Sequence, residues 1–231
     1  MNNFDEIKNR VYKANMELPR QGVVIYNFGN VSAIDREKGV IAIKPSGVMY
    51  EKLKAEDMVI LDPDGNVIEG KLKPSSDTKT HLVLYKHFPT IGGVVHTHSK
   101  FSVAWSQAAR PLPVYGTTHA DQTHLDIPCT EFMSDEKIQG DYEQETGNQI
   151  IQAFQDISYK EVQMVLVAGH GPFTWGETPE KAVFNAVVLE ALAEMALLTE
   201  QINPQISRLK ETLIQKHYQR KHGPNAYYGQ G

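Results

Sequence analysis

The chain has 231 residues, of which 41% are hydrophobic and 22% charged, and its formal net charge is -5. This composition is typical of a soluble globular protein and excludes a mainly disordered chain. Acidic and basic residues are scattered without blocks of one sign, so we expect no nucleic-acid partner.

The cysteine content and the apolar segments indicate the compartment. Cys129 is the only cysteine, so no intrachain disulfide can form. The first six residues lack the basic and apolar regions of a signal peptide. The most apolar segment, 182–198, is interrupted by Asn185, Glu190 and Glu194, which is unfavourable for a membrane span. We therefore expect a cytoplasmic protein with no membrane partner.

The first third of the chain predicts one helix followed by closely spaced strands. Apolar residues recur at helical spacing from Phe4 to Leu18, Asn3 and Glu6 resemble a capping box, and Pro19 should end this helix. Strands are expected at 23–26, 31–34, 40–43, 58–61 and 66–69. Such short connections favour antiparallel pairing over parallel βαβ winding.

The rest of the chain alternates predicted helices and strands. Residues 73–78 should open a helix, a strand is expected at 92–98, and helices follow at 101–109 and 143–154. A buried strand is predicted at 162–168, an apolar helix at 179–202 and a last helix at 206–221. We find no repeat or linker, so we expect a single domain over 1–231, with a mainly antiparallel sheet and helices against it.

Two histidines at the end of a predicted strand are candidate metal ligands. His96 and His98 follow Val94 and Val95, and alternation along a strand would place both imidazoles on one face, roughly 6.6 Å apart. A catalytic zinc site commonly uses three protein ligands. The pair alone is also compatible with histidines that only make hydrogen bonds at a strand end.

Two further residues could complete such a site. His170, between Gly169 and Gly171, is a candidate third ligand, although a histidine in a turn can also be satisfied by hydrogen bonds alone. Asp77, at the start of a predicted helix, could be a fourth ligand or an outer carboxylate. The alternative for Asp77 is a helix N-cap.

Three short segments rich in glycine and serine could bind an anion. Gly29-Asn30, Ser46-Gly47 and Ser75-Ser76 each end a strand or begin a helix, and Lys44 precedes the second segment. Backbone N–H groups at a helix start, hydroxyls and an ammonium together would suit a phosphate. Each segment alone is just a turn, so the prediction requires that they converge in the fold.

Seven motifs in order along the chain carry a family resemblance. They are Phe-Gly-Asn-Val-Ser-Ala (28–33), Lys-Pro-Ser-Gly-Val (44–48), Lys-Pro-Ser-Ser-Asp (73–77), His-Thr-His-Ser (96–99), Gly-Thr-Thr-His-Ala-Asp (116–121), Gly-His-Gly-Pro-Phe (169–173) and Ala-Tyr-Tyr-Gly-Gln (226–230). Together they resemble the L-ribulose-5-phosphate 4-epimerase family of the class II aldolase/adducin-like superfamily, over essentially the whole chain.

The resemblance implies a role for each matching residue. His96, His98 and His170 match zinc ligands and Asp77 the acidic residue associated with the metal, while Asp121 and Tyr228 match two acid/base residues on opposite faces of the substrate. The phosphate and substrate positions fall on Gly29, Asn30, Lys44, Ser46, Gly47, Ser75 and Ser76, with Thr117, Glu143 and His217 as supporting residues. Without the resemblance, Asp121 could equally be a loop cap, and Tyr228 would be assigned to a frayed tail.

The resemblance also implies a fold, an assembly and a reaction. The fold would be a three-layer α/β/α unit with a mainly antiparallel central sheet, in a homotetramer with each site between neighbouring subunits. The reaction would interconvert L-ribulose 5-phosphate and D-xylulose 5-phosphate by retro-aldol cleavage and re-addition, with Zn²⁺ as the cofactor. The alternative is a zinc-dependent sugar-phosphate aldolase of the same superfamily, and an adducin-like interaction domain is a third possibility.

Overall fold

The computed structural model describes residues 4–227. Its helices are α1 (Asp5–Arg20), α2 (Thr78–His87), α3 (Lys100–Gln107), α4 (Thr117–Ala120), α5 (Asp135–Gln139), α6 (Tyr142–Ala153), α7 (Pro179–Ile202) and α8 (Glu211–His222). Its strands are β1 (Asn30–Asp35), β2 (Val40–Ile43), β3 (Val59–Leu61), β4 (Val67–Glu69), β5 (Gly93–His96), β6 (Met164–Val167) and β7 (Gly171–Gly176). Two 3₁₀ turns, η1 (Tyr50–Lys52) and η2 (Ala55–Asp57), precede β3.

The strands form one sheet of seven in the order β4-β3-β2-β1-β5-β7-β6. Every neighbouring pair is antiparallel, which confirms the expectation from the short connections. β5 lies between β1 and β7, and its last residue, His96, is paired with Asn30 on one side and Phe173 on the other. The centre of the sheet therefore brings three of the seven motifs side by side.

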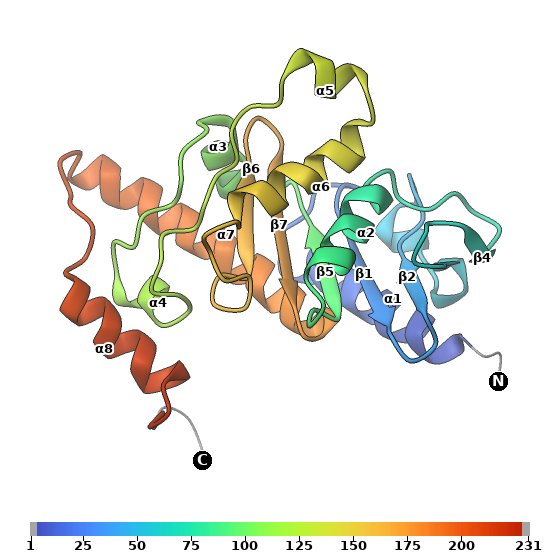
Figure 1. The fold of residues 1–231 in the computed structure, drawn as a ribbon, viewed down its shortest axis with the longest axis horizontal. Helices are drawn as coiled ribbons and strands as arrows, with labels where there is room; N and C mark the ends of the chain where they lie inside the picture. The colour runs from blue at the N-terminus through green and yellow to red at the C-terminus, as the bar shows by residue number, and fades with distance from the viewer. Residues whose placement is uncertain (1–3, 228–231) are drawn as a thin grey trace.

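Helices cover both faces of this sheet, and Figure 1 shows α2 and α6 over one face and α1 and α7 over the other. The alternation along β1 explains the two layers. Val31 and Ala33 belong to an apolar cluster with α1 and α7. Ser32 points to the opposite face, where its hydroxyl lies 2.7 Å from His81 Nδ1 and 2.8 Å from the Tyr85 hydroxyl, both in α2. The three-layer α/β/α fold expected from the sequence is confirmed.

Helix α7 is the longest element and is long and apolar enough, by length and composition alone, to cross a membrane. The core helix of a soluble protein passes the same test. α7 packs along β5 and β7, and the Glu190 carboxylate in its middle accepts hydrogen bonds from the backbone N–H groups of Phe101 and Ser102. Phe184, Met195 and Leu198 nevertheless leave apolar side chains exposed on its outer side.

Several predicted elements are wrong or displaced. Residues 23–26 form no strand, because the chain turns at Tyr26, whose φ is 53°, and the side chains of Ile25 and Tyr26 are exposed. The strand predicted to run through His98 ends at His96. The last helix begins at Glu211, five residues after the predicted start at 206.

The predicted ends of the first helix also need correction. Pro19 does not end α1, which includes it and stops at Arg20. The described N-cap residue is Phe4, without a side-chain cap, and Asn3 lies outside the described residues.

The strand β7 was not predicted. It contains Pro172 and two glycines, so its local sequence disfavours a strand, whereas pairing with both β5 and β6 stabilises one.

Candidate metal centre and active site

A pocket of about 360 Å³ lies where the ends of β1, β2 and β5 meet the N-terminal ends of α2 and α6. It contains every predicted metal and phosphate residue, and Glu143 as well. Its lining residues are Asn27, Phe28, Gly29, Asn30, Lys44, Pro45, Ser46, Gly47, Ser75, Ser76, Asp77, His96, His98, Tyr142, Glu143 and His170. The fold thus supplies the convergence that no single turn motif could establish.

Three histidines gather in this pocket. The candidate ligand atoms of His96, His98 and His170 all lie within 4.8 Å of one another. The Nε2 atoms of His96 and His98 are 3.0 Å apart. Two nitrogens bound at 2.0–2.1 Å to one tetrahedral ion would be roughly 3.3 Å apart, so the triad fits a metal ion such as zinc.

The way the triad is built differs from the expected strand alternation. His96 ends β5, His98 lies in the loop after it, and His170 lies in the turn between β6 and β7. Gly171, just after His170, packs closely on the loop after β5, because a Cβ there would lie 3.0 Å from the Thr97 carbonyl oxygen, tighter than most such contacts. The tight packing of these two loops therefore brings the three rings together.

The histidines are held in the form that binds a metal. His96 Nδ1 lies 2.9 Å from the Pro172 carbonyl oxygen, which can only accept a hydrogen bond, so this contact leaves Nε2 with its lone pair. Burial lowers the pKa of His98, and burial together with the neighbouring His96 lowers that of His170 to about 3. These two rings are therefore neutral at physiological pH, as a metal ligand must be.

Asp77 stands beside the triad as a buried carboxylate. It occupies the N-cap position of α2, but its side chain makes no capping hydrogen bond. Instead, its Oδ2 accepts hydrogen bonds from Asn30 Nδ2 at 2.6 Å and from the Ser75 hydroxyl at 3.3 Å. Burial opposes the ionisation of Asp77, but the hydrogen bond from Asn30 favours the carboxylate, and the pKa of Asp77 lies below its usual value. Asp77 is not one of the three clustered ligands, but it lines the same pocket.

The same pocket also offers groups for an anion. Gly29 has φ of +82°, and a Cβ there would lie 2.8 Å from the His96 carbonyl oxygen, so a larger residue would distort this turn. The backbone N–H groups of Ser46 and Ser75 are already bonded to the carbonyls of Lys73 and Lys44. Against the sequence expectation, these two serines can offer an anion only their hydroxyls.

Lys44 is the buried cation of the pocket. Its side chain is 2% exposed, and its Nζ lies 3.3 Å from the Asn27 carbonyl oxygen, with no carboxylate in ion-pair contact among the described residues. Burial lowers the pKa of Lys44 to about 8, although the charge of Asp77 acts in the opposite direction. An incoming phosphate would supply the negative charge that Lys44 lacks.

A second cluster of predicted residues lies elsewhere in the chain. Asp121 follows α4 and faces α8, where His217 Nδ1 lies 3.0 Å from its Oδ1 and Arg220 donates to both of its oxygens. None of these residues lines the metal pocket, and Figure 1 shows α4 and α8 together at one end of the molecule. Thr117 begins α4, in the same region. The structure therefore does not bring Asp121, Thr117 or His217 to the histidines within one chain.

Two tyrosines, one predicted and one not, are relevant to the site. Tyr228 lies outside the described residues. Tyr142 was missed, although its hydroxyl lies 3.3 Å from His170 Nδ1 and it lines the pocket beside Glu143. Its position at the first turn of α6 was the only available signal, and it does not distinguish a site residue from a surface one.

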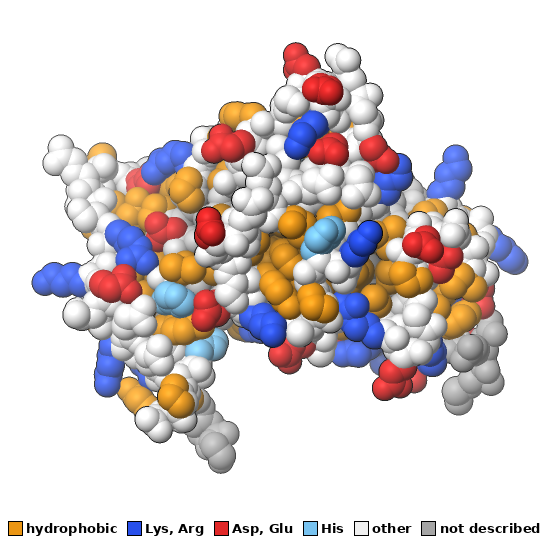
Figure 2. Space-filling model, viewed as in Figure 1, with side chains coloured by type: hydrophobic (Ala, Val, Ile, Leu, Met, Phe, Trp, Pro, Cys, Tyr) orange, Lys and Arg blue, Asp and Glu red, His pale blue; other side chains and the backbone are white. Residues whose placement is uncertain are grey.

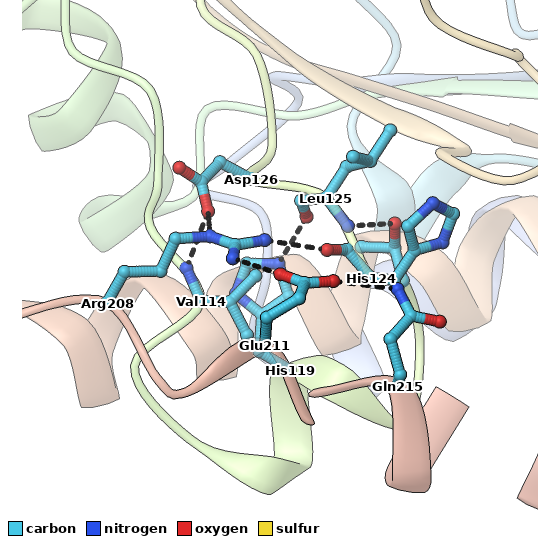
Figure 3. Close-up of polar contacts among 9 residues, drawn as sticks. Val114, His119, His124, Leu125, Asp126, Arg208, Glu211 and Gln215 are labelled. Atoms are coloured by element: carbon cyan, nitrogen blue, oxygen red, sulfur yellow. Dashed lines mark hydrogen bonds and ion pairs between the residues drawn. The ribbon is translucent and has the colours of Figure 1, made fainter. Parts of the chain in front are cut away.

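A salt-bridge network anchors the segment that leads into α8. Figure 3 shows Arg208 between Asp126, the His124 carbonyl and Glu211, with donor–acceptor distances of 2.9, 2.8 and 2.7 Å. The same carboxylate of Asp126 also accepts the backbone N–H of Val114 at 2.9 Å. This network holds the start of α8 against the loop after α4.

Comparison with known proteins gives a consistent result. Residues 9–197 match the model of the family described as Class II Aldolase and Adducin N-terminal domain. The L-ribulose-5-phosphate 4-epimerase UlaF of Salmonella paratyphi B is 52% identical over 227 residues, covering 98% of this chain and 100% of that protein.

Solved structures share the fold at low sequence identity. An L-fuculose 1-phosphate aldolase superposes with a TM-score of 0.78 at 23% identity, covering 93% of this chain and 95% of that one. The L-fuculose 1-phosphate aldolase of Glaciozyma antarctica PI12 superposes with a TM-score of 0.76 at 19% identity, covering 96% of this chain and 84% of that one. At these identities the likeness describes the architecture and not the substrate.

Proposed function

Because this chain belongs to the class II aldolase and adducin family, we propose that it is a zinc-dependent epimerase that interconverts L-ribulose 5-phosphate and D-xylulose 5-phosphate. The name of the relative that is 52% identical over nearly the whole chain supports this substrate pair. The observation that carries the proposal is the pocket in which three clustered histidines share one cavity with buried Lys44. Such a pocket suits a small sugar that carries a ketone at one end and a phosphate at the other.

Different residues of the pocket would bind the metal ion and the phosphate. His96, His98 and His170 would hold the zinc ion, with Asp77 beside them, and the bound ion would act as a Lewis acid on the ketone and the adjacent hydroxyl. Lys44 and the Ser46 hydroxyl would bind the phosphate, and the Ser75 hydroxyl would join them by turning away from Asp77. A phosphate held in this way keeps its two-carbon fragment in the site after the sugar is cleaved.

Inversion at carbon 4 is difficult by direct deprotonation, because the hydrogen there is not acidic. Removal of the proton from the 4-hydroxyl instead lets the bond between carbons 3 and 4 break, giving an enediolate and glycolaldehyde phosphate. The aldehyde group then rotates so that its opposite face points to the enediolate. The enediolate attacks this face, and the new alkoxide takes up a proton. Asp121 would exchange a proton with the 4-oxygen on one face of the aldehyde, and Tyr228 on the other face.

The separation of the two clusters supports an assembly in which neighbouring subunits share each site. Asp121 does not line the pocket of its own chain, so we propose a cytoplasmic homotetramer in which Asp121 and Tyr228 of one subunit complete the metal pocket of the next. The exposed apolar side chains of α7 are compatible with subunit contacts. No membrane partner is needed, since α7 packs on the sheet through much of its length.

A coupled assay tests the activity directly. Purified protein loaded with zinc should convert L-ribulose 5-phosphate to D-xylulose 5-phosphate, and chelation should abolish turnover until zinc is restored. Net release of glycolaldehyde phosphate would instead indicate the aldolase alternative. Full turnover after complete chelation would contradict the metal role, and protein that binds no metal would point to an adducin-like interaction domain.

A subunit-mixing experiment tests the shared site. The variants His98→Asn and Asp121→Asn should each be inactive alone, because each lacks one half of the site. If the site lies between subunits, a mixed and reassembled sample should regain about a quarter of the wild-type activity, because each site draws its two halves at random. A sample that stays inactive although mixed tetramers form would show that both halves come from one chain.

A further inference from the structure

Arg220 makes the most extensive contact with the carboxylate of Asp121. Its Nη2 donates to Oδ1 at 2.9 Å and to Oδ2 at 2.8 Å, and its Nε donates to Oδ1 at 3.1 Å. Both side chains are largely shielded from solvent, with exposed fractions of 24% for Arg220 and 14% for Asp121. A forked pair of this kind fixes the plane of a carboxylate and not only its charge.

Among residues 4–227, the other titratable groups in contact with Asp121 belong to α8. His217 Nδ1 lies 3.0 Å from Oδ1, Lys221 Nζ lies 3.6 Å from Oδ2, and His222 Nε2 contacts the Asp121 backbone carbonyl at 3.0 Å. Within α4, His119 contacts the Leu125 carbonyl instead. Among the described residues, no other acidic side chain contacts this group.

The two oxygens of Asp121 are used unequally. Oδ1 receives contacts from His217 Nδ1 and from Arg220 Nε and Nη2, whereas Oδ2 accepts one hydrogen bond, from Arg220 Nη2, and lies 3.6 Å from Lys221 Nζ. A carboxylate has about four lone-pair sites, so Oδ2 retains capacity for a further proton. Arg220 therefore binds both oxygens and fixes the orientation of the carboxylate, and Oδ2 is the oxygen with fewer hydrogen bonds.

We propose that Arg220 is the positioning residue of Asp121, orienting its carboxylate so that Oδ2 accepts the proton of the substrate hydroxyl. This inference rests on the proposed function, in which Asp121 is an acid/base residue. It adds that the contact with Arg220 sets both the direction of Asp121 and the pH range in which it is a base. Arg220 itself need not touch the substrate.

The electrostatics agree with this geometry. Burial alone would raise the pKa of Asp121, but the hydrogen bonds from Arg220 and His217 and the charges of Lys221 and Arg220 outweigh burial and lower it. A base with a lowered pKa stays ionised as the pH falls. Removing Arg220 should therefore raise the pKa of Asp121 and move the acid side of the pH profile to higher pH.

The test compares Arg220→Gln, Arg220→Lys and wild type in pH profiles of kcat and KM. Arg220→Gln should lower kcat by about 10-fold or more, leave KM unchanged and shift the acid side of the profile to higher pH. Arg220→Lys retains the charge but not the fork, so its acid side should lie close to wild type while kcat stays reduced. An acid side that does not move in Arg220→Gln would overturn the proposal.

Arg208→Gln is the matched control, because Arg208, which precedes α8, also pairs with an aspartate, Asp126, and within the described residues makes no hydrogen bond or ion pair with Asp121. It should leave the acid side of the profile in place. An equal shift in Arg208→Gln would show that Arg220 only holds α8 in the fold. Circular dichroism and thermal unfolding of each variant identify any that fails to fold, in which case Arg220→Lys decides between the two roles.

A readout without substrate separates this inference from the proposed function. In protein labelled with carbon-13 at the aspartate carboxyls, the Asp121 signal, assigned with Asp121→Asn, should titrate at higher pH in Arg220→Gln than in wild type. If it does so in protein without epimerase activity, the proposed reaction is wrong but Arg220 does control Asp121. If it does not shift in active protein, the reaction stands and the role of Arg220 is wrong.

Discussion

The metal pocket and the Asp121 cluster hold their ionisable groups in opposite ways. In the pocket, burial keeps His98 and His170 neutral, as ligands of a metal cation must be. Burial also lowers the pKa of Lys44, whose charge a bound anion would balance. At Asp121, side chains of α8 surround a carboxylate and keep it ionised before any ligand arrives. The pocket is thus built to bind ions, and the cluster is built to maintain a base.

The two regions also differ in what holds them in place. The pocket lies at the centre of the sheet, where β1, β5 and β7 are paired on both sides, and its loops pack tightly against one another. The cluster depends on α8, whose one fully buried residue among those described is Ile214 and which is anchored by surface contacts (Figure 3). Figure 2 shows that acidic and basic side chains alternate over the visible face, without a large area of one sign.

The largest effect should come from removing a histidine of the triad. His98→Asn should lose bound zinc and lower kcat/KM by roughly 10³-fold or more, because a Lewis acid stabilises the developing charge by several kcal/mol. Metal content by mass spectrometry and the coupled assay measure the two effects. His87→Asn, at the far end of α2 and outside the pocket, is the matched control. Retention of zinc by His98→Asn would disprove the assignment.

A smaller loss is expected from the acid/base cluster. Asp121→Asn should lower kcat by roughly 10²-fold or more, the contribution typical of a general base, while zinc content stays unchanged. Asp126→Asn changes the same residue type in the neighbouring loop and should retain turnover. Loss of zinc from Asp121→Asn would mean that the two regions are not separate in function.

Lys44 should affect binding more than chemistry. Lys44→Met should raise KM by roughly 10- to 100-fold, since a hydrogen bond to a charged group is worth about 1.5–3 kcal/mol. In the wild type, KM should rise as the pH increases through about 8, because the ammonium form that binds phosphate is lost above its pKa. Steady-state kinetics from pH 6 to pH 10 test this, with Lys52→Met as an exposed control. A KM that does not change with pH would exclude Lys44 from phosphate binding.

The smallest effect should follow from loosening α8. Arg208→Gln removes a partly exposed network worth about 0.2–1 kcal/mol and should lower the Tm by about 1–4 °C without changing zinc content. Thermal unfolding by calorimetry provides the measurement. A large loss of zinc would show that the start of α8 supports the metal pocket as well.

The sequence predicted most of the fold because hydrophobic periodicity is local. The patterns around 5–18, 40–43 and 179–202 correspond to α1, β2 and α7, and the short connections correctly indicated antiparallel pairing. The failures occurred where local preference and tertiary contacts disagree. Residues 23–26 have strand-forming side chains but no partner strand, whereas β7 contains Pro172 and is fixed by strands on both sides.

By itself the sequence determined the kinds of groups available: three histidines, one lysine among glycines and serines, and an aspartate in a distant motif. Only the tertiary structure decided which of them meet. His98 and His170 join His96 through loop packing and not through strand alternation. Asp121 lies against Arg220 and not against these three histidines. The physical reason is that residue type fixes the chemistry of a group, whereas burial and long-range packing fix its neighbours and hence its charge.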